Sequence, residues 1–212
     1  MLIQQMTIRT LFLLPILLLL ALTPARAADK AVATFAGGCF WCVEHDFDPI
    51  KGVISTTSGY IGGQQESPTY KEVSKGGTGH TEAVQIIYDP AQVSYAQLLK
   101  RFWTGIDPTT PNAQFCDHGE QYRAEIFVHT PGQRAAAQKS LKNLKASKPF
   151  AQPIVVPITE ASRFYPAETY HQDYAHKNPL RYNFYRFRCG RDHRLQELWQ
   201  GYDAELLIKG IE

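Results

Sequence analysis

Short apolar stretches bounded by turn residues recur along the chain, and they predict strands. Residues 31–36 (AVATFA) form an apolar run that ends at Gly37-Gly38, and residues 80–88 (HTEAVQIIY) alternate between polar and apolar positions until Asp89-Pro90. The pattern predicts five strands in all, at residues 31–36, 53–60, 80–88, 122–129 and 154–159.

Longer segments with apolar residues at helical spacing lie between and after these strands. They predict helices at residues 40–50, 68–75, 95–103, 131–147 and 192–208. Ser94 is a typical N-cap for the third helix, and Pro131 suits the first position of the fourth. Two successive β-α-β units indicate an α+β protein, a ferredoxin-like split βαβ sandwich, and we expect a mobile C-terminal segment after it.

The first 27 residues have the pattern of a secretory signal peptide. Arg9 precedes an apolar run at residues 11–22, and Ala25-Arg26-Ala27 is a small-residue cleavage site. The run is shorter than the roughly 20 residues that span a bilayer, so an uncleaved anchor is the less favoured alternative. We therefore expect cleavage of residues 1–27, a single domain at residues 28–212, and an exported, periplasmic or extracytoplasmic protein with no stable membrane association.

Removal of the signal peptide changes the charge balance. Without Arg9 and Arg26 the 22 basic residues fall to 20, which equals the 20 acidic residues. The segment 181–188 (RYNFYRFR) is basic and aromatic, like some single-stranded nucleic-acid sites, but it also suits simple packing. Zero net charge and export favour packing, so we expect no nucleic-acid partner. We also expect a monomer.

Four cysteines remain in the mature chain, and structural disulfides are their simplest expectation in an oxidising compartment. The pair Cys39-Phe40-Trp41-Cys42 also allows a redox dithiol, half of a metal site, or a nucleophile with an unrelated neighbour. A zinc site needs further paired ligands, and Cys116 and Cys189 each stand alone, so we expect no metal.

Cys39 follows two glycines at the predicted start of a helix. Unpaired backbone N–H groups and the helix dipole stabilise a thiolate at such a position. A buried cysteine that packs as a small apolar residue is the competing interpretation, and this segment alone does not separate the two.

Four other polar residues are candidates for a site. Glu82 lies among apolar residues in a predicted strand, where a carboxyl tends to stay protonated. Asp117 lies just before the fourth predicted strand and Tyr122 at its start, and Tyr70 lies in the segment SPTYKEV. Each of these residues is ordinary by itself.

The segments GGCFWCVE, SGYIGG, SPTYKEV, GHTEAVQIIYDP and QFCDHGEQYRAEIF follow one another in this order. In that order and spacing the chain resembles the peptide methionine sulfoxide reductase A family over about residues 31–190. The resemblance implies thiol-dependent reduction of methionine S-sulfoxide, free or in proteins, for the repair of oxidised proteins, without a cofactor.

The resemblance also implies roles for individual residues. Cys39 would attack the sulfoxide sulfur and become a sulfenic acid, and Glu82 would protonate the sulfoxide oxygen. The substrate would be bound by the hydroxyls of two tyrosines, a carboxylate and an aromatic wall: Tyr70, Tyr122, Asp117, Phe40 and Trp41.

A second thiol must then resolve the sulfenic acid as an intramolecular disulfide. Cys189 matches the position at which the family often carries its recycling cysteine. Cys42 is the rival, and Cys116 is a weaker candidate. Thioredoxin or a thioredoxin-like reductant would reduce the disulfide. A general thiol–disulfide oxidoreductase, with Cys39 and Cys42 as its whole active site, is the alternative enzyme.

Overall fold

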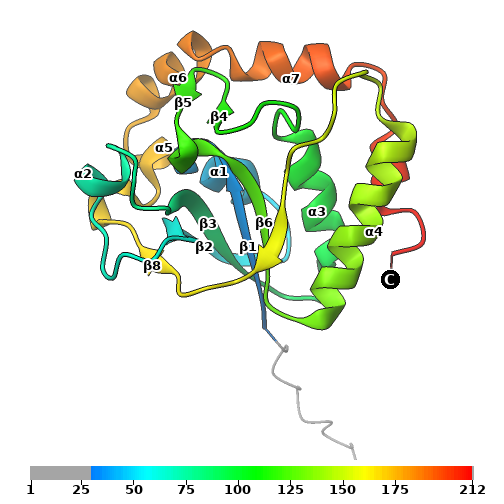
Figure 1. Ribbon diagram of the computed structural model, residues 1–212, viewed down its shortest axis with the longest axis horizontal. Coiled ribbons are helices and arrows are strands. Elements are labelled where there is room, and N and C mark those ends of the chain that lie inside the picture. The colour runs from blue at the N-terminus through cyan, green and yellow to red at the C-terminus, as the bar shows by residue number, and fades with distance from the viewer. Residues whose placement is uncertain (1–29, 212) are drawn as a thin grey trace, which may run out of the picture.

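A six-stranded sheet forms the centre of the molecule (Figure 1). The computed structural model describes residues 30–211, so the predicted signal peptide lies outside the described residues. The strand order is β7-β6-β1-β3-β2-β8. The strands are β1 (Ala31–Gly37), β2 (Val53–Ile61), β3 (Thr81–Tyr88), β6 (Ala124–Val128), β7 (Ile158–Glu160) and β8 (Tyr165–Pro166).

The four central strands have the split βαβ topology that the sequence predicts. β3 lies between β1 and β2 and is antiparallel to both, and β1 is antiparallel to β6 on its other side. In sequence order these strands therefore lie 4-1-3-2, with α1 (Phe40–Phe47) connecting the first two and α3 (Tyr95–Thr104) connecting the last two. The ferredoxin-like prediction is confirmed.

The main core lies between the sheet and helices α1 and α3, with α4 (Pro131–Ser147) against β6 and α3. Phe35 of β1 is fully buried at its centre. Its ring stacks on Phe47 of α1 at 5.5 Å and on Phe102 of α3 at 5.0 Å between centroids. This aromatic contact fixes α1, and with it the cysteine that precedes the helix, against the end of β1.

Replacement of Phe35 by Ala is expected to lower the free energy of unfolding by about 3–5 kcal/mol, since it removes a buried ring and leaves a cavity. Chemical denaturation measures the loss. Leu180→Ala is the matched control, because that side chain is 87% exposed and its truncation leaves no cavity. A loss below about 1 kcal/mol for Phe35→Ala would show that the stacked rings do not stabilise the core.

Several predicted boundaries differ from the observed ones. The fourth predicted helix matches α4 residue for residue, and the Ser94 side chain caps α3 by accepting the Gln97 N–H at 3.2 Å. The fifth predicted strand is wrong over residues 154–157: β7 starts at Ile158, because Pro153 and Pro157 have no N–H for a strand ladder.

Other elements are shorter than predicted. Helix α1 ends at Phe47, and the short helix α2 covers only Tyr70–Val73. The fourth predicted strand is β6, which begins at Ala124, because Glu120–Tyr122 form a 3-10 turn, η1. Two short strands that the sequence analysis missed, β4 (Ala113–Gln114) and β5 (Asp117–His118), form a hairpin beside this turn.

The C-terminal segment, for which the sequence predicts mobility, forms further helices next to this hairpin (Figure 1). The predicted helix at 192–208 is interrupted at Gly201, whose φ is +72°. The elements are η2 (Thr169–His171), α5 (Tyr174–Lys177), α6 (Pro179–Arg188), α7 (Arg191–Trp199) and η3 (Ala204–Ile208). Within residues 30–211, no helix combines the length and the apolar character that crossing a membrane requires.

Candidate active site

Cys39 lies at the junction between β1 and α1, as the N-cap residue of the helix. Gly38 before it has φ +83°, and a Cβ atom there would approach Cβ of Gln114 to 2.5 Å, so only glycine fits this turn. Arg191 at the start of α7 donates to the carbonyl oxygen of Gly37 at 3.2 Å. The thiol is therefore held by a turn that the sheet, the β4–β5 hairpin and α7 all support.

A small pocket of about 70 Å³ opens beside this thiol. The structure places all seven predicted catalytic and substrate-binding residues in its wall. It adds Tyr185, which the sequence analysis missed. The lining residues are Cys39, Phe40, Trp41, Tyr70, Glu82, Asp117, Tyr122 and Tyr185.

Glu82 projects from β3 into the floor of this pocket. It is 2% exposed, and its Oε2 accepts the backbone N–H of Phe40 at 3.0 Å. Burial raises the pKa of Glu82 to about 8, against the Phe40 hydrogen bond, which lowers it. At neutral pH the carboxyl therefore carries a proton that it can donate into the pocket.

Two tyrosines in the wall of the pocket supply hydroxyl groups. Tyr70 begins α2, and its backbone N–H donates to Oε1 of Glu168 at 2.9 Å, while Tyr122 ends η1. Burial raises the pKa of Tyr70 to about 12 and also raises the pKa of Tyr122. Both hydroxyls thus remain protonated at neutral pH and can donate hydrogen bonds.

Asp117 and Tyr185 also line the pocket. The Tyr185 hydroxyl donates to Oδ2 of Asp117, and Tyr185 lines the pocket together with Cys39. Burial raises the pKa of Asp117, against this hydrogen bond, which lowers it. The basic and aromatic composition of residues 181–188 indicates packing and does not predict that Tyr185 lines the pocket. Tyr185 reaches the pocket only because of where α6 lies in the fold.

The C-terminal segment packs against the aromatic wall. The Trp41 ring stacks on Tyr174 at 3.7 Å between centroids, and its Nε1–H donates to Nδ1 of His171 at 3.1 Å. The Phe40 ring is 1% exposed and lies 4.9 Å from the His171 ring. His171 and Tyr174 were not singled out from the sequence, since each lies about 130 residues from the motif that it supports.

Cys39 and Cys42 are both free and buried, at 7% and 2% exposure. Burial raises the pKa of Cys39 well above its usual value, which differs from the thiolate expected at a helix start. A hydrogen bond from the Cys39 thiol, together with the charges of Arg191 and Arg186, lowers the pKa of Cys42 to about 7. Of the two thiols, Cys42 is therefore the more acidic.

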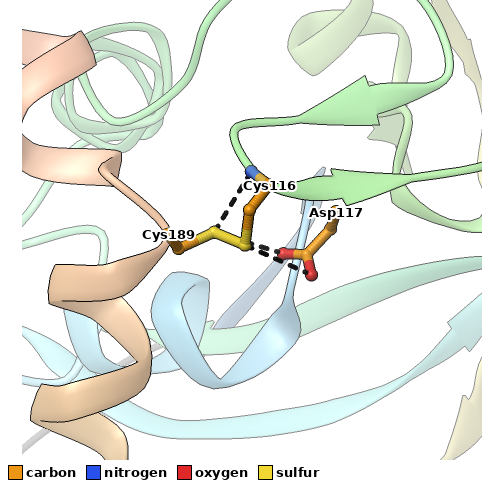
Figure 2. A group of neighbouring side chains, drawn as sticks. All are labelled: Cys116, Asp117 and Cys189. Atoms are coloured by element: carbon orange, nitrogen blue, oxygen red, sulfur yellow. Dashed lines mark hydrogen bonds between the residues drawn. A yellow bond between two sulfur atoms is a disulfide. The ribbon is translucent and has the colours of Figure 1, made fainter.

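The other two cysteines form a disulfide, Cys116–Cys189, across 73 residues (Figure 2). Cys116 lies in the turn of the β4–β5 hairpin, and Cys189 is the C-cap of α6. Sγ of Cys189 lies 3.9 Å from Oδ2 of Asp117, so the disulfide adjoins the acid that lines the pocket. Cys189, predicted as the resolving cysteine, is thus paired with Cys116 in this structure.

This arrangement suits a small substrate with one polar oxygen and one apolar substituent. The pocket places a sulfur nucleophile next to a protonated carboxyl and two hydroxyl donors. Phe40 and Trp41 complete it with an apolar wall. Because both thiols of the Cys39–Cys42 pair are buried, a protein disulfide does not reach them easily.

Comparisons with known proteins agree with this description. The family model for peptide methionine sulfoxide reductase matches residues 31–203. A peptide methionine sulfoxide reductase MsrA from Bacillus licheniformis is 50% identical over 173 residues, which cover 82% of this chain and 96% of that relative. A second such enzyme, from Caulobacter vibrioides, is 47% identical over 90% of this chain and 97% of its own length.

Solved structures show the same fold. The reduced form of Mxr1 from Saccharomyces cerevisiae has a TM-score of 0.67 at 31% identity, covering 72% of this chain and 87% of that chain. Methionine sulfoxide reductase A of Corynebacterium diphtheriae has a TM-score of 0.64 at 35% identity, covering 71% of this chain and 76% of that chain. The chain belongs to the peptide methionine sulfoxide reductase family, and it is an oxidoreductase that reduces methionine sulfoxide through thiol–disulfide chemistry.

Proposed function

We propose that the chain reduces the S epimer of methionine sulfoxide with Cys39 as the nucleophile and Glu82 as the acid. The observation that carries this assignment is the pairing of a buried thiol with a buried, protonated carboxyl in one small pocket. Substrates are free methionine sulfoxide and oxidised methionine in proteins, and the activity repairs oxidised proteins.

Epimer selection follows from the asymmetry of the pocket. A sulfoxide sulfur carries an oxygen and a methyl group on different sides. The hydroxyls of Tyr70 and Tyr122 and the Glu82 carboxyl donate toward the oxygen, and Phe40 and Trp41 contact the methyl group. Asp117 holds the substrate from the side that Tyr185 covers. The opposite epimer would place its methyl group among the donors and leave them unpaired.

The chemical step transfers one oxygen. The Cys39 sulfur, as its proton passes to the adjacent Cys42 thiolate, forms a bond to the sulfoxide sulfur while Glu82 protonates the oxygen. Transfer of the oxygen to Cys39 then releases methionine and leaves a sulfenic acid on Cys39. Sulfur in the substrate is reduced by two electrons, and Cys39 is oxidised by two.

A second thiol of the chain displaces hydroxide from the sulfenic acid and forms an intramolecular disulfide, and the hydroxide leaves as water once it takes a proton. Cys42 and Cys189 are the two candidates. We propose that thioredoxin or a thioredoxin-like protein then supplies the two electrons that restore the thiols. These steps use thiols alone and need no cofactor.

We also propose that the protein acts outside the cytoplasm. The support is the signal-peptide pattern of residues 1–27, with cleavage after Ala27 and no stable membrane association afterwards. We propose a monomer because residues of one chain form the whole wall of the described pocket.

A single-turnover assay with each epimer tests the proposed function. The mature protein is mixed, without reductant, with blocked methionine S-sulfoxide or R-sulfoxide, and methionine and free thiols are counted. We expect methionine from the S epimer alone, with two thiols lost for each methionine formed. Methionine from neither epimer, together with reduction of insulin disulfides, would instead identify a general thiol–disulfide oxidoreductase.

A further inference from the structure

We propose that Cys116, Asp117 and Cys189 bind one zinc ion once the disulfide between the two cysteines is reduced. We call these three residues the outer cluster. The ion competes with the disulfide for the two sulfurs and with the substrate for Asp117, so zinc inhibits the enzyme. This effect on activity rests on the proposed function, whereas the binding of zinc does not.

The first argument is that three zinc ligands converge. Sγ of each cysteine and a carboxylate oxygen of Asp117 all lie within 4.8 Å of one another (Figure 2). The two cysteines are 73 positions apart in the sequence, which is why the sequence predicts no metal, but the β4–β5 hairpin meets the end of α6 in the fold. Two thiolates with one carboxylate suit Zn²⁺ and do not suit Mg²⁺ or Ca²⁺.

The second argument is the spacing of these atoms. Oδ1 of Asp117 lies 3.9 Å from Sγ of Cys116, and Oδ2 lies 3.9 Å from Sγ of Cys189. A tetrahedral zinc ion with bonds of about 2.3 Å to sulfur and about 2.1 Å to oxygen holds such a pair of atoms about 3.6 Å apart. Reduction frees each sulfur to rotate about its Cα–Cβ bond, so the three side chains can surround an ion without a change in the backbone.

The third argument is that two ligands already have partners that orient them. The Tyr185 hydroxyl donates to Oδ2 of Asp117, which leaves Oδ1 available to a metal ion. The backbone N–H of Cys116 donates to Sγ of Cys189 at 3.2 Å. Protein groups that bind metals usually have such hydrogen bonds, which fix the direction of the ligand atom.

Charge and access also suit a cation with further ligands. Two thiolates and one carboxylate carry three negative charges, and Zn²⁺ neutralises two of them. The charge of Arg191, whose guanidinium lies 4.6 Å from the centre of the Phe115 ring, acts on Asp117 and offsets the third. Cys116 is exposed, and a surface hollow of about 320 Å³ beside Phe115 and Cys189 gives an ion an approach and room for a water molecule as fourth ligand.

Zinc binding moves no electrons. The ion displaces the protons of the two thiols and forms two Zn–S bonds, and the sulfurs keep their oxidation state. While the ion is bound, Cys116 and Cys189 cannot form a disulfide, and Asp117 turns from the substrate pocket toward the metal. Zinc therefore stops any recycling step that uses Cys189, and it weakens the binding of methionine sulfoxide.

Equilibrium dialysis against zinc tests the proposal on the unaltered protein. One sample retains the Cys116–Cys189 disulfide, and the other is reduced with a phosphine and freed of it under nitrogen. We expect one zinc ion per reduced chain and none in the disulfide form. Cobalt(II) in place of zinc should give a thiolate-to-cobalt charge-transfer absorption in the reduced form alone. Equal uptake by both forms, or no uptake by the reduced form, would overturn the proposal.

Variants locate the ion. Reduced Cys116→Ser should bind zinc at least about 100-fold less tightly, and Tyr185→Phe about 10-fold less tightly, because the first loses a ligand and the second a partner of a ligand. Cys42→Ser is the matched control, since it also lacks one thiol but should keep the affinity of the wild type. Weakened binding in Cys42→Ser, with full affinity in Cys116→Ser, would place the ion at Cys39 and Cys42 and overturn the proposal.

A single-turnover assay measures the competition for Asp117. In the reduced wild type, one equivalent of zinc should raise the sulfoxide concentration that gives half the maximal rate about 10-fold, and in Cys116→Ser it should leave that concentration unchanged. An unchanged value in wild type that holds one zinc ion would overturn the competition. Zinc binding in a protein that forms no methionine even without zinc would overturn the proposed function and leave the zinc site intact.

Discussion

A Cys39→Ser variant is expected to form methionine at least about 10³-fold more slowly than the wild type, because a hydroxyl is a far weaker nucleophile than sulfur in the same position. The N-cap position of α1 tolerates Ser well, so the fold should remain intact. The measurement is the methionine formed from the S epimer in a single-turnover assay. Thermal unfolding and tryptophan fluorescence check folding and substrate binding.

The matched control is Cys42→Ser, which removes a sulfur one helical turn away and keeps the nucleophile. It should still form one methionine per chain. If Cys39→Ser formed methionine at the rate of this control, the nucleophile would be another residue, and the geometry around Glu82 would need a different explanation.

A Glu82→Gln variant is expected to slow the chemical step by about 10²–10⁴-fold at neutral pH, since it removes the proton donor. The amide keeps the shape of the side chain, and its oxygen can still accept the Phe40 N–H. The dissociation constant of the substrate should therefore change little. Rapid-quench measurements over a range of sulfoxide concentrations separate the two quantities. A large loss of affinity with an unchanged chemical rate would assign Glu82 to binding alone.

The pH profile gives an independent test of the same role. Burial raises the pKa of Glu82 to about 8, so its carboxyl is protonated below that pH and loses its proton above it. The single-turnover rate of the wild type should thus decline on the alkaline side of about pH 8. Since Gln has no proton to lose, the rate of Glu82→Gln should keep rising with pH as Cys39 ionises. An alkaline decline of equal size in both proteins would exclude Glu82 as its source.

The raised pKa of Glu82 also makes the stability of the fold depend on pH. The folded protein retains the Glu82 proton at pH values where the unfolded chain, with an ordinary carboxyl pKa near 4.3, has released it. The contribution of Glu82 to the free energy of unfolding therefore falls as pH rises from about 4 to about 8. Denaturation of the wild type and of Glu82→Gln across this range should differ by that slope, because the other buried carboxyls, such as Glu44, are present in both proteins.

The amino-acid sequence by itself determined the elements that a local pattern encodes. The alternation along residues 80–88 predicted β3, Ser94 predicted the start of α3, and Pro131 predicted the start of α4. The order of its motifs identified the family and all seven predicted residues of the pocket. These features are readable because strand and helix periodicity and capping act within a few residues, and because a motif keeps its chemistry wherever the chain places it.

Tertiary structure decided what depends on contacts between distant segments. The Cys116–Cys189 disulfide joins two residues that lie 73 positions apart. No local sequence pattern distinguishes this pairing from a disulfide between either residue and Cys39. Tyr185 enters the pocket because α6 lies against the β4–β5 hairpin, not because of its neighbours in sequence. Burial, which protonates Glu82 and shields Cys42 from a protein reductant, exists only once the sheet and helices pack, because it is a property of the folded chain.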